Sequence, residues 1–266
     1  MSSSDLLRLL GNVSEQVVEQ RIESILQQVS KSNQVLYGCI VQRHFLQNSL
    51  RANPFYAKHV LCRNLKEQKV LEVGCCLGTD TRRLIDDGVS LSNIVAIDVN
   101  FQFIQLGFQL FQDQDKPIAS RFFEKSVAAD DLVEFLQKNT SLPPFDIIVA
   151  NAVIHTLTLE DCKKAVQNFA KLLEEDGVLI GYLPTLREGE RNEPYKMIEA
   201  FQNSRVLHSK SHFQEILKDN DFSYVEMCTR GMEQVFGKQQ EKLKDWENVD
   251  ITFFVAQRRL FNYQSS

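Results

Sequence analysis

Two glycines and two carboxylates stand at a spacing that suits the binding of a nucleotide. The segment VLEVGCCLGTD begins at Val70 and carries Glu72, Gly74 and Gly78, and VAIDVN follows over residues 95–100 with Asp98 at its centre. A glycine backbone lets an adenosine approach the chain closely, and a carboxylate at a strand end accepts hydrogen bonds from ribose hydroxyls. The pattern predicts a nucleotide site if the two segments are neighbouring strands joined by a helix.

Short apolar segments alternate with amphipathic segments from residue 69 onward, as such a site requires. The apolar segments predict strands over 69–74, 93–99, 120–127, 145–154, 177–184, 222–229 and 251–259. The amphipathic segments predict helices over 79–88, 100–114, 129–139, 158–177 and 211–221. This alternation favours right-handed βαβ units and a mostly parallel sheet with helices on both faces.

The rest of the chain suggests additions around this sheet. Residues 1–60 have helical spacing of apolar residues, with Ser14 as the expected N-cap of a helix that buries Val18, Ile22 and Ile25. We expect them to form an N-terminal helical cap on a domain that spans 61–266. Residues 185–212 are polar with scattered apolar anchors, and we expect a helix-containing insertion there on the acceptor side.

The glycine loop distinguishes between nucleotide cofactors. Dinucleotide enzymes require G-x-G-x-x-G, whereas residues 72–78 read E-x-G-x-C-x-G. This resembles motif I of class I methyltransferases, E/D-x-G-x-G-x-G, with Cys76 at the middle glycine. The resemblance implies a Rossmann-like, doubly wound, seven-stranded α/β fold and S-adenosyl-L-methionine as the cofactor. A Tyr-x-x-x-Lys pair is also missing after the fourth expected strand, which makes an NAD-dependent oxidoreductase the weaker interpretation.

A longer resemblance covers the segment from Gly74 to Asp115. GCCLGTDTRRLIDDG and DVNFQFIQLGFQLFQD are similar to the loop and helix of methyltransferases from fungal polyketide and meroterpenoid pathways. That family usually has an aspartate after the third strand, where this chain has Ser126. Together with neighbouring positions, the candidate cofactor residues are Glu72, Gly74, Cys75, Gly78, Asp98, Val99, Phe103, Ser126, Val127, Asn151, Ala152, Tyr37 and Arg43.

Three of the candidates have a competing structural explanation. His155 follows the fourth expected strand and is a candidate general base, since neutral imidazole accepts protons near physiological pH. A structural histidine at this turn is an equal alternative. Arg43 lies on an expected apolar helical stripe and can clamp the cofactor carboxylate, although pairing with a surface acid is favoured. Tyr37 can close over the cofactor, or it can pack in the core.

The composition of the chain argues against several classes of partner and ligand. The net charge of -5 argues against nucleic acid, and no apolar run is long enough to span a membrane. The six cysteines lack disulfide or zinc spacing, and His208 and His212 have no carboxylate to complete a metal site, so we expect no metal. The thiols and the absence of a signal-like N-terminus lead us to expect a cytoplasmic protein.

The preferred hypothesis is an enzyme that methylates a hydroxyl or carboxylate oxygen of a small molecule. A protein methyltransferase, which docks a polypeptide on the N-terminal helices, is the first alternative, and a non-catalytic scaffold is the second. The intact Glu72, Gly74, Gly78 and Asp98 argue against the scaffold. Whether the N-terminal helices cover the pocket or form a homodimer interface stays open.

Overall fold

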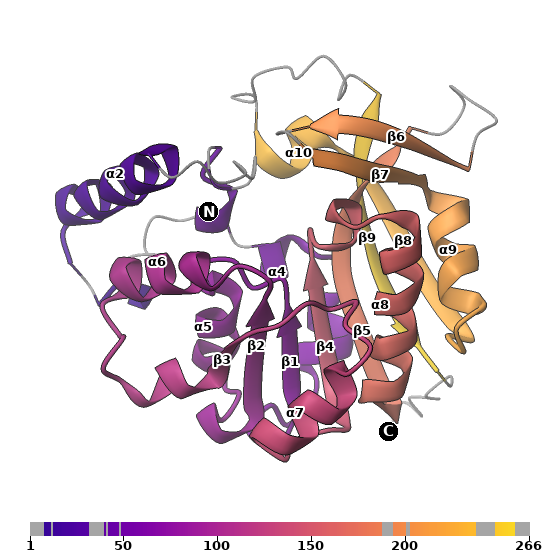
Figure 1. The fold of residues 1–266 in the computed structure, drawn as a ribbon, viewed down its shortest axis with the longest axis horizontal. Helices are drawn as coiled ribbons and strands as arrows, with labels where there is room; N and C mark the ends of the chain where they lie inside the picture. The colour runs from indigo at the N-terminus through magenta and orange to yellow at the C-terminus, as the bar shows by residue number, and fades with distance from the viewer. Residues whose placement is uncertain are drawn as a thin grey trace.

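A twisted sheet between two layers of helices forms the body of the molecule (Figure 1). The computed structural model describes residues 8–11, 13–31, 40, 42–47, 49–187, 194–200, 203–237 and 248–258. In Figure 1 the arrowheads of β1, β2 and β4 point towards the top, so the carboxyl ends of these strands face the top of the view.

Five parallel strands make the centre of the sheet in the order β3-β2-β1-β4-β5. Their bounds are β1 Val70–Val73, β2 Ile94–Asp98, β3 Phe122–Glu124, β4 Phe145–Asn151 and β5 Leu173–Leu186. Strands β1 and β2 are buried along their whole length, as expected for strands covered on both faces of the sheet. The predicted alternation and parallel sheet are therefore confirmed.

Two antiparallel strands complete the seven expected from the sequence. β9 (Val249–Gln257) pairs with β5, and β8 (Tyr224–Gly231) pairs with β9. The described sheet has nine strands because β6 (Tyr195–Ala200) and β7 (Asn203–Ser209) form a further antiparallel pair. The prediction of a helix within 185–212 is therefore wrong for the residues of β6 and β7. β7 extends the sheet by pairing with the end of β5, where its backbone groups find hydrogen-bond partners.

Helices cover both faces of the sheet. On one face lie α7 (Leu132–Thr140), α8 (Leu159–Leu172) and α9 (Lys210–Lys218), and on the other lie α5 (Thr79–Asp86) and α6 (Phe101–Phe111). Thr158 is the N-cap of α8, since its hydroxyl accepts a hydrogen bond from the Asp161 N–H. The helix ends at Leu172 instead of Gly177, because Leu173 already pairs with Phe145 of β4. Short 3-10 helices connect these elements: η3 Leu91–Asn93, η4 Pro117–Arg121 and η5 Ile154–Thr156. No described helix is long and apolar enough to cross a membrane.

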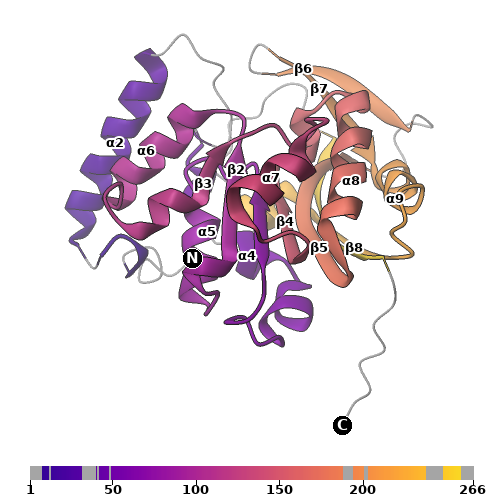
Figure 2. The same cartoon turned by 60° about the horizontal axis from the view of Figure 1, so that its bottom comes forward.

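The N-terminal region divides between two places. α2 (Glu15–Lys31) lies beside α6 in both views and buries Val18, Ile22 and Ile25 as predicted (Figures 1 and 2). By contrast, α4 (Ser49–Ala52) and the π-helix η2 (Ala57–Leu61) pack directly on the sheet, where Tyr56 and Val60 share a core with Val70.

The continuous helix expected around Arg43 is interrupted. Arg43 has the left-handed backbone conformation, with φ of 58°, and precedes the 3-10 helix η1 (His44–Leu46). Arg43 therefore does not lie on a helical stripe with Leu46 and Leu50. Its guanidinium pairs with Glu19 of α2 at 2.6 Å, and both side chains are partly exposed.

A buried arginine holds the loop between β1 and α5. Arg82 pairs with Asp113, with N···O distances of 2.7 and 2.8 Å, and its Nη1 donates to the carbonyl oxygens of Leu77 and Gly78. The guanidinium lies over the rings of Phe111 and Phe122, 4.1 and 5.2 Å from their centroids.

Glycine makes the approach of α6 to the same loop possible. A Cβ atom on Gly107 would lie 2.2 Å from the carbonyl oxygen of Leu77, so a larger residue would force the helix and the loop apart. Arg82, Gly107, Phe111 and Asp113 belong to the segment that resembles the fungal methyltransferases. In this structure they fix the loop to α6.

We predict that Arg82→Ala destabilises the protein strongly, because it leaves the Asp113 carboxylate buried without its partner. Removing one member of a buried ion pair costs about 3–5 kcal/mol of unfolding free energy. The matched control is Arg8→Ala, whose side chain is 59% exposed in its pair with Asp86 and which should lose at most about 1 kcal/mol. Urea unfolding measures both, and equal small losses would contradict this role of Arg82.

Candidate functional site

A cavity of about 160 Å³ lies at the carboxyl ends of β1, β2 and β4. This is the edge of an open α/β sheet where ligands bind, at the point where the strand order reverses. Seven of its lining residues are candidates from the sequence: Gly74, Asp98, Val99, Phe103, Ser126, Val127 and Ala152. The other lining residues are Cys76, Lys125, Val153, Thr156 and Leu157.

The glycine loop turns sharply into this cavity. Gly74 has φ of 64°, and a Cβ atom on it would lie 2.7 Å from Val153 Cγ2, so a side chain there would enter the space between β1 and β4. Cys76 also has positive φ, at 52°, and its backbone N–H donates to Asp98 Oδ2 at 2.8 Å. The sequence marked Cys76 only as the substitute for a glycine, and the positive φ explains why glycine suits this position.

Asp98 is the main polar group of the cavity. Its carboxylate accepts hydrogen bonds from the backbone N–H groups of Cys76 and Asn100, at 2.8 and 2.9 Å. Burial raises the pKa of the Asp98 carboxyl, and these backbone donors oppose the rise. Asp98 is thus held in place by the loop while it faces the cavity.

Three candidates support the loop from behind instead of lining the cavity. Glu72 is buried and accepts a hydrogen bond from the Thr81 hydroxyl, and burial together with the nearby Asp80 charge raises its pKa well above the ordinary value. Cys75 is buried, and its N–H donates to the Ile97 carbonyl at 3.0 Å. Gly78 caps α5 with φ of 68°, and a Cβ atom there would lie 2.5 Å from the Phe122 ring.

The far wall of the cavity comes from the segment after β3. The Ser126 hydroxyl accepts a hydrogen bond from the Ala128 N–H at 3.2 Å, which shapes the turn that follows β3. Next to it, Lys125 pairs with Asp131 at 2.7 Å and lies 4.7 Å from the centroid of the Phe135 ring. Ser126 could be selected from sequence because it follows the third strand, whereas Thr156 ends η5, Leu157 follows it, and neither belongs to a motif.

Asn151 does not line this cavity but joins a polar network beside it. Its Nδ2 donates to Asp80 Oδ2 at 2.8 Å, and the Ser49 hydroxyl donates to the same carboxylate oxygen. Arg83 pairs with Asp80 Oδ1 at 3.1 Å and also donates to the carbonyl oxygens of Leu46 and Gln47. The network therefore links the N-terminal segment, the start of α5 and the end of β4. The sequence analysis did not select Asp80 or Ser49.

His155 does not line this cavity. It is buried in η5, which packs against β7, and burial with the charges of Arg205 and His208 lowers its pKa to about 3. His208 is fully buried, and its Nδ1 lies 3.1 Å from Nδ1 of His212. Among the described residues, no group of three or more His, Cys, Asp or Glu side chains can hold a metal ion. Tyr37 lies outside the described residues.

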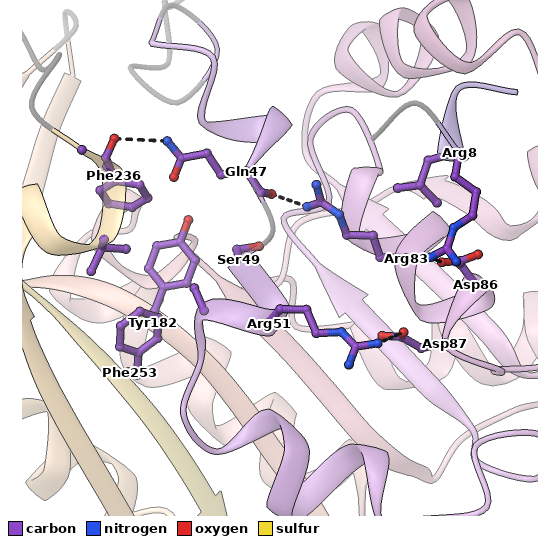
Figure 3. Close-up of a pocket in the computed structure, with 14 residues that line it drawn as sticks. Arg8, Gln47, Ser49, Arg51, Arg83, Asp86, Asp87, Tyr182, Phe236 and Phe253 are labelled. Carbon is purple, nitrogen blue, oxygen red and sulfur yellow. Dashed lines mark hydrogen bonds and ion pairs between the residues drawn. The ribbon is translucent and has the colours of Figure 1, made fainter. Parts of the chain in front are cut away.

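A second, larger cavity of about 740 Å³ lies on the other side of the Asp80 network (Figure 3). Ser49, Gln47 and Arg83 line its middle, and Tyr182, Phe236 and Phe253 line one end. The opposite end carries two ion pairs, Arg8–Asp86 and Arg51–Asp87. No motif in the sequence indicated this cavity, because its walls come from segments that are far apart along the chain.

The sequence of the central segment is similar to known methyltransferases. Residues 71–179 match the family model described as a methyltransferase domain. An O-methyltransferase of Stereocaulon alpinum is 30% identical over 138 residues, which cover 52% of this chain and 39% of that protein. A methyltransferase of Penicillium rubens is 31% identical over 137 residues, covering 52% of this chain and 48% of that protein. The chain thus spans about half the length of these relatives or less.

Solved structures share the fold at low sequence identity. The glycopeptide N-methyltransferase MtfA has a TM-score of 0.54 at 14% identity, covering 82% of this chain and all of that one. An N-methyltransferase of Haemonchus contortus has a TM-score of 0.55 at 13% identity, covering 84% of this chain and 57% of that one. Residues 71–179 are therefore similar in sequence to methyltransferase domains, and the chain shares the Rossmann-like fold of these solved structures.

Proposed function

We propose that this chain is an S-adenosylmethionine-dependent methyltransferase that methylates an oxygen of a small molecule. The observation that carries the proposal is the placement of Asp98 at the end of β2, facing one cavity with Gly74 and Cys76. That arrangement matches the requirements of a ribose: a carboxylate that accepts two hydrogen bonds and a bare backbone beside it.

The residues around the cavity fit the parts of this cofactor. Asp98 would hold the ribose hydroxyls, and Val99, Phe103, Ser126 and Val127 would enclose the adenine. Gly74 and Ala152 would face the methionine part, close to Asn151. When bound, S-adenosylmethionine supplies a methyl group already activated on a sulfonium sulfur. The chain itself has to align the acceptor and exclude water, which are the main contributions of positioning to catalysis.

A small-molecule acceptor is favoured over a polypeptide. Fungal relatives include proteins named O-methyltransferase from Stereocaulon alpinum and from a further fungal strain, and this supports an oxygen as the attacking atom. Their similarity spans only part of each protein, so the acceptor stays a proposal. We also propose a cytoplasmic location, because the six cysteines lack the spacing of a disulfide framework. A homodimer stays a prediction.

We predict that Asp98→Ala weakens the binding of S-adenosylhomocysteine by at least about tenfold, because hydrogen bonds to a charged group contribute roughly 1.5–3 kcal/mol each. Glu124→Ala is the matched control: Glu124 pairs in register with Asp98, is exposed and does not line the cavity. Isothermal titration calorimetry measures both variants beside the unmodified protein. Unchanged affinity in Asp98→Ala would overturn the assignment of the cavity.

A role for His155 as general base stays a prediction. The pKa of His155 determines how readily its side chain accepts a proton. A histidine with a pKa of about 3 is neutral at physiological pH and is a weak base. The unfolded chain takes up a proton as the pH falls through 6.5, while the folded chain does not until about 3. His155 therefore contributes stability above pH 6.5 that is lost as the pH falls.

We predict that between pH 7 and pH 5 this loss is roughly 2 kcal/mol, and that His155→Asn reduces the pH dependence of unfolding by that amount. Urea unfolding at the two pH values measures it. A catalytic rate that depends on a group with a pKa near 6.5, and that loses this dependence in His155→Asn, would instead identify His155 as the base.

A further inference from the structure

The two cavities lie next to each other at the ends of β4 and β5. Ala152 lines the small cavity, and its N–H donates at 2.8 Å to the carbonyl oxygen of Tyr182, whose side chain lines the large cavity. Asn151 and Tyr182 are register partners in the sheet. Two ligands, one bound in each cavity, would thus be separated from each other by little more than the ends of two adjacent strands.

A polar partition stands between them. Ser49 lines the large cavity, and its hydroxyl donates to the Asp80 carboxylate, which also accepts a hydrogen bond from Asn151. A polar atom of a ligand in the large cavity would find hydrogen-bonding groups on this side.

One end of the large cavity is aromatic. The ring of Tyr182 lies 6.1 Å from the ring of Phe236 and 5.8 Å from that of Phe253, in tilted arrangements (Figure 3). Phe236 ends the short helix α10 (Met232–Phe236), and His44 stacks on it at 4.3 Å. A flat ring has aromatic faces and edges to contact here, which favours it over an aliphatic group of equal size.

Charged groups at the far end are already paired. Arg51 bridges to Asp87 and Arg8 bridges to Asp86, so this end offers no excess charge to a ligand. The volume of about 740 Å³ falls within the range of small-molecule sites, roughly 300–1,000 Å³. The features that select a ligand are therefore the aromatic wall and the polar partition.

We propose that the large cavity binds the methyl acceptor, and that the acceptor is an aromatic molecule whose ring packs on Phe236 and Tyr182. Its hydroxyl or carboxyl oxygen points to the partition at Ser49, next to the cofactor cavity. The inference rests on the proposed function, because only a methyl donor in the small cavity gives the second ligand a role.

The test uses the full chain saturated with S-adenosylhomocysteine and two probes of the same carbon skeleton. 2-Naphthol is flat and aromatic, and decahydro-2-naphthol is its saturated counterpart. Calorimetry measures both probes against the unmodified protein and against Phe236→Leu, which keeps an apolar side chain at a half-buried position but removes the ring. Phe101→Leu is the matched control, because Phe101 is 41% exposed and lines neither cavity.

We expect 2-naphthol to bind at least about threefold more tightly than decahydro-2-naphthol, and Phe236→Leu to weaken 2-naphthol by about three- to tenfold. Phe101→Leu should bind 2-naphthol as the unmodified protein does, and all variants should bind S-adenosylhomocysteine equally. Absent 2-naphthol binding, or equal binding by Phe236→Leu, overturns the aromatic acceptor site alone. Failure of the unmodified protein to bind S-adenosylhomocysteine overturns the proposed function, and this inference with it.

Discussion

The guanidinium of Arg82 is the group on which the candidate site depends. It is buried beneath the phenylalanine rings of α6 and β3, it pairs with Asp113, and it satisfies the carbonyl oxygens of Leu77 and Gly78. A buried charge is tolerated only when it is paired and hydrogen-bonded. Loss of any one partner of Arg82 would therefore destabilise the folded protein strongly. Fixing the two carbonyl groups fixes the turn after β1, which in turn brings the Cys76 N–H to Asp98.

Three carboxylates surround the loop, and each has different partners. Glu72 is buried within β1 and hydrogen-bonded to Thr81, Asp80 connects the N-terminal segment to β4, and Asp98 alone among the three lines the small cavity. The Asp98 carboxylate at the cavity is compatible with a cationic sulfonium ligand, whose methyl group would face the large cavity. The fold thus separates the groups that build the loop from the group that binds.

The sequence predicted the fold, and seven of its candidate cofactor residues line the small cavity, because strands and strand ends follow from local pattern. Strand and helix alternation gave the parallel sheet, and the end of each strand gave Gly74, Asp98, Ser126 and Ala152. The predictions from sequence were wrong where contacts between distant segments determine the structure. The turn at Arg43 and the hairpin over 195–209 have no periodic signal, since each forms by finding partners in distant segments. The large cavity was beyond sequence reasoning for the same reason, since its lining residues come from distant segments: Arg8, Leu9, Gln47, Ser49, Arg51, Ala52, Arg83, Asp86, Asp87, Tyr182, Val235, Phe236, Gly237 and Phe253.

The most direct test of the account is a crystal structure of the protein with S-adenosylhomocysteine bound. We predict that both ribose hydroxyls lie within hydrogen-bonding distance of the Asp98 carboxylate, that the adenine lies between Phe103 and Val127, and that the sulfur faces the partition formed by Ser49, Asp80 and Asn151. A nucleoside in the large cavity, or a ribose turned away from Asp98, would contradict it.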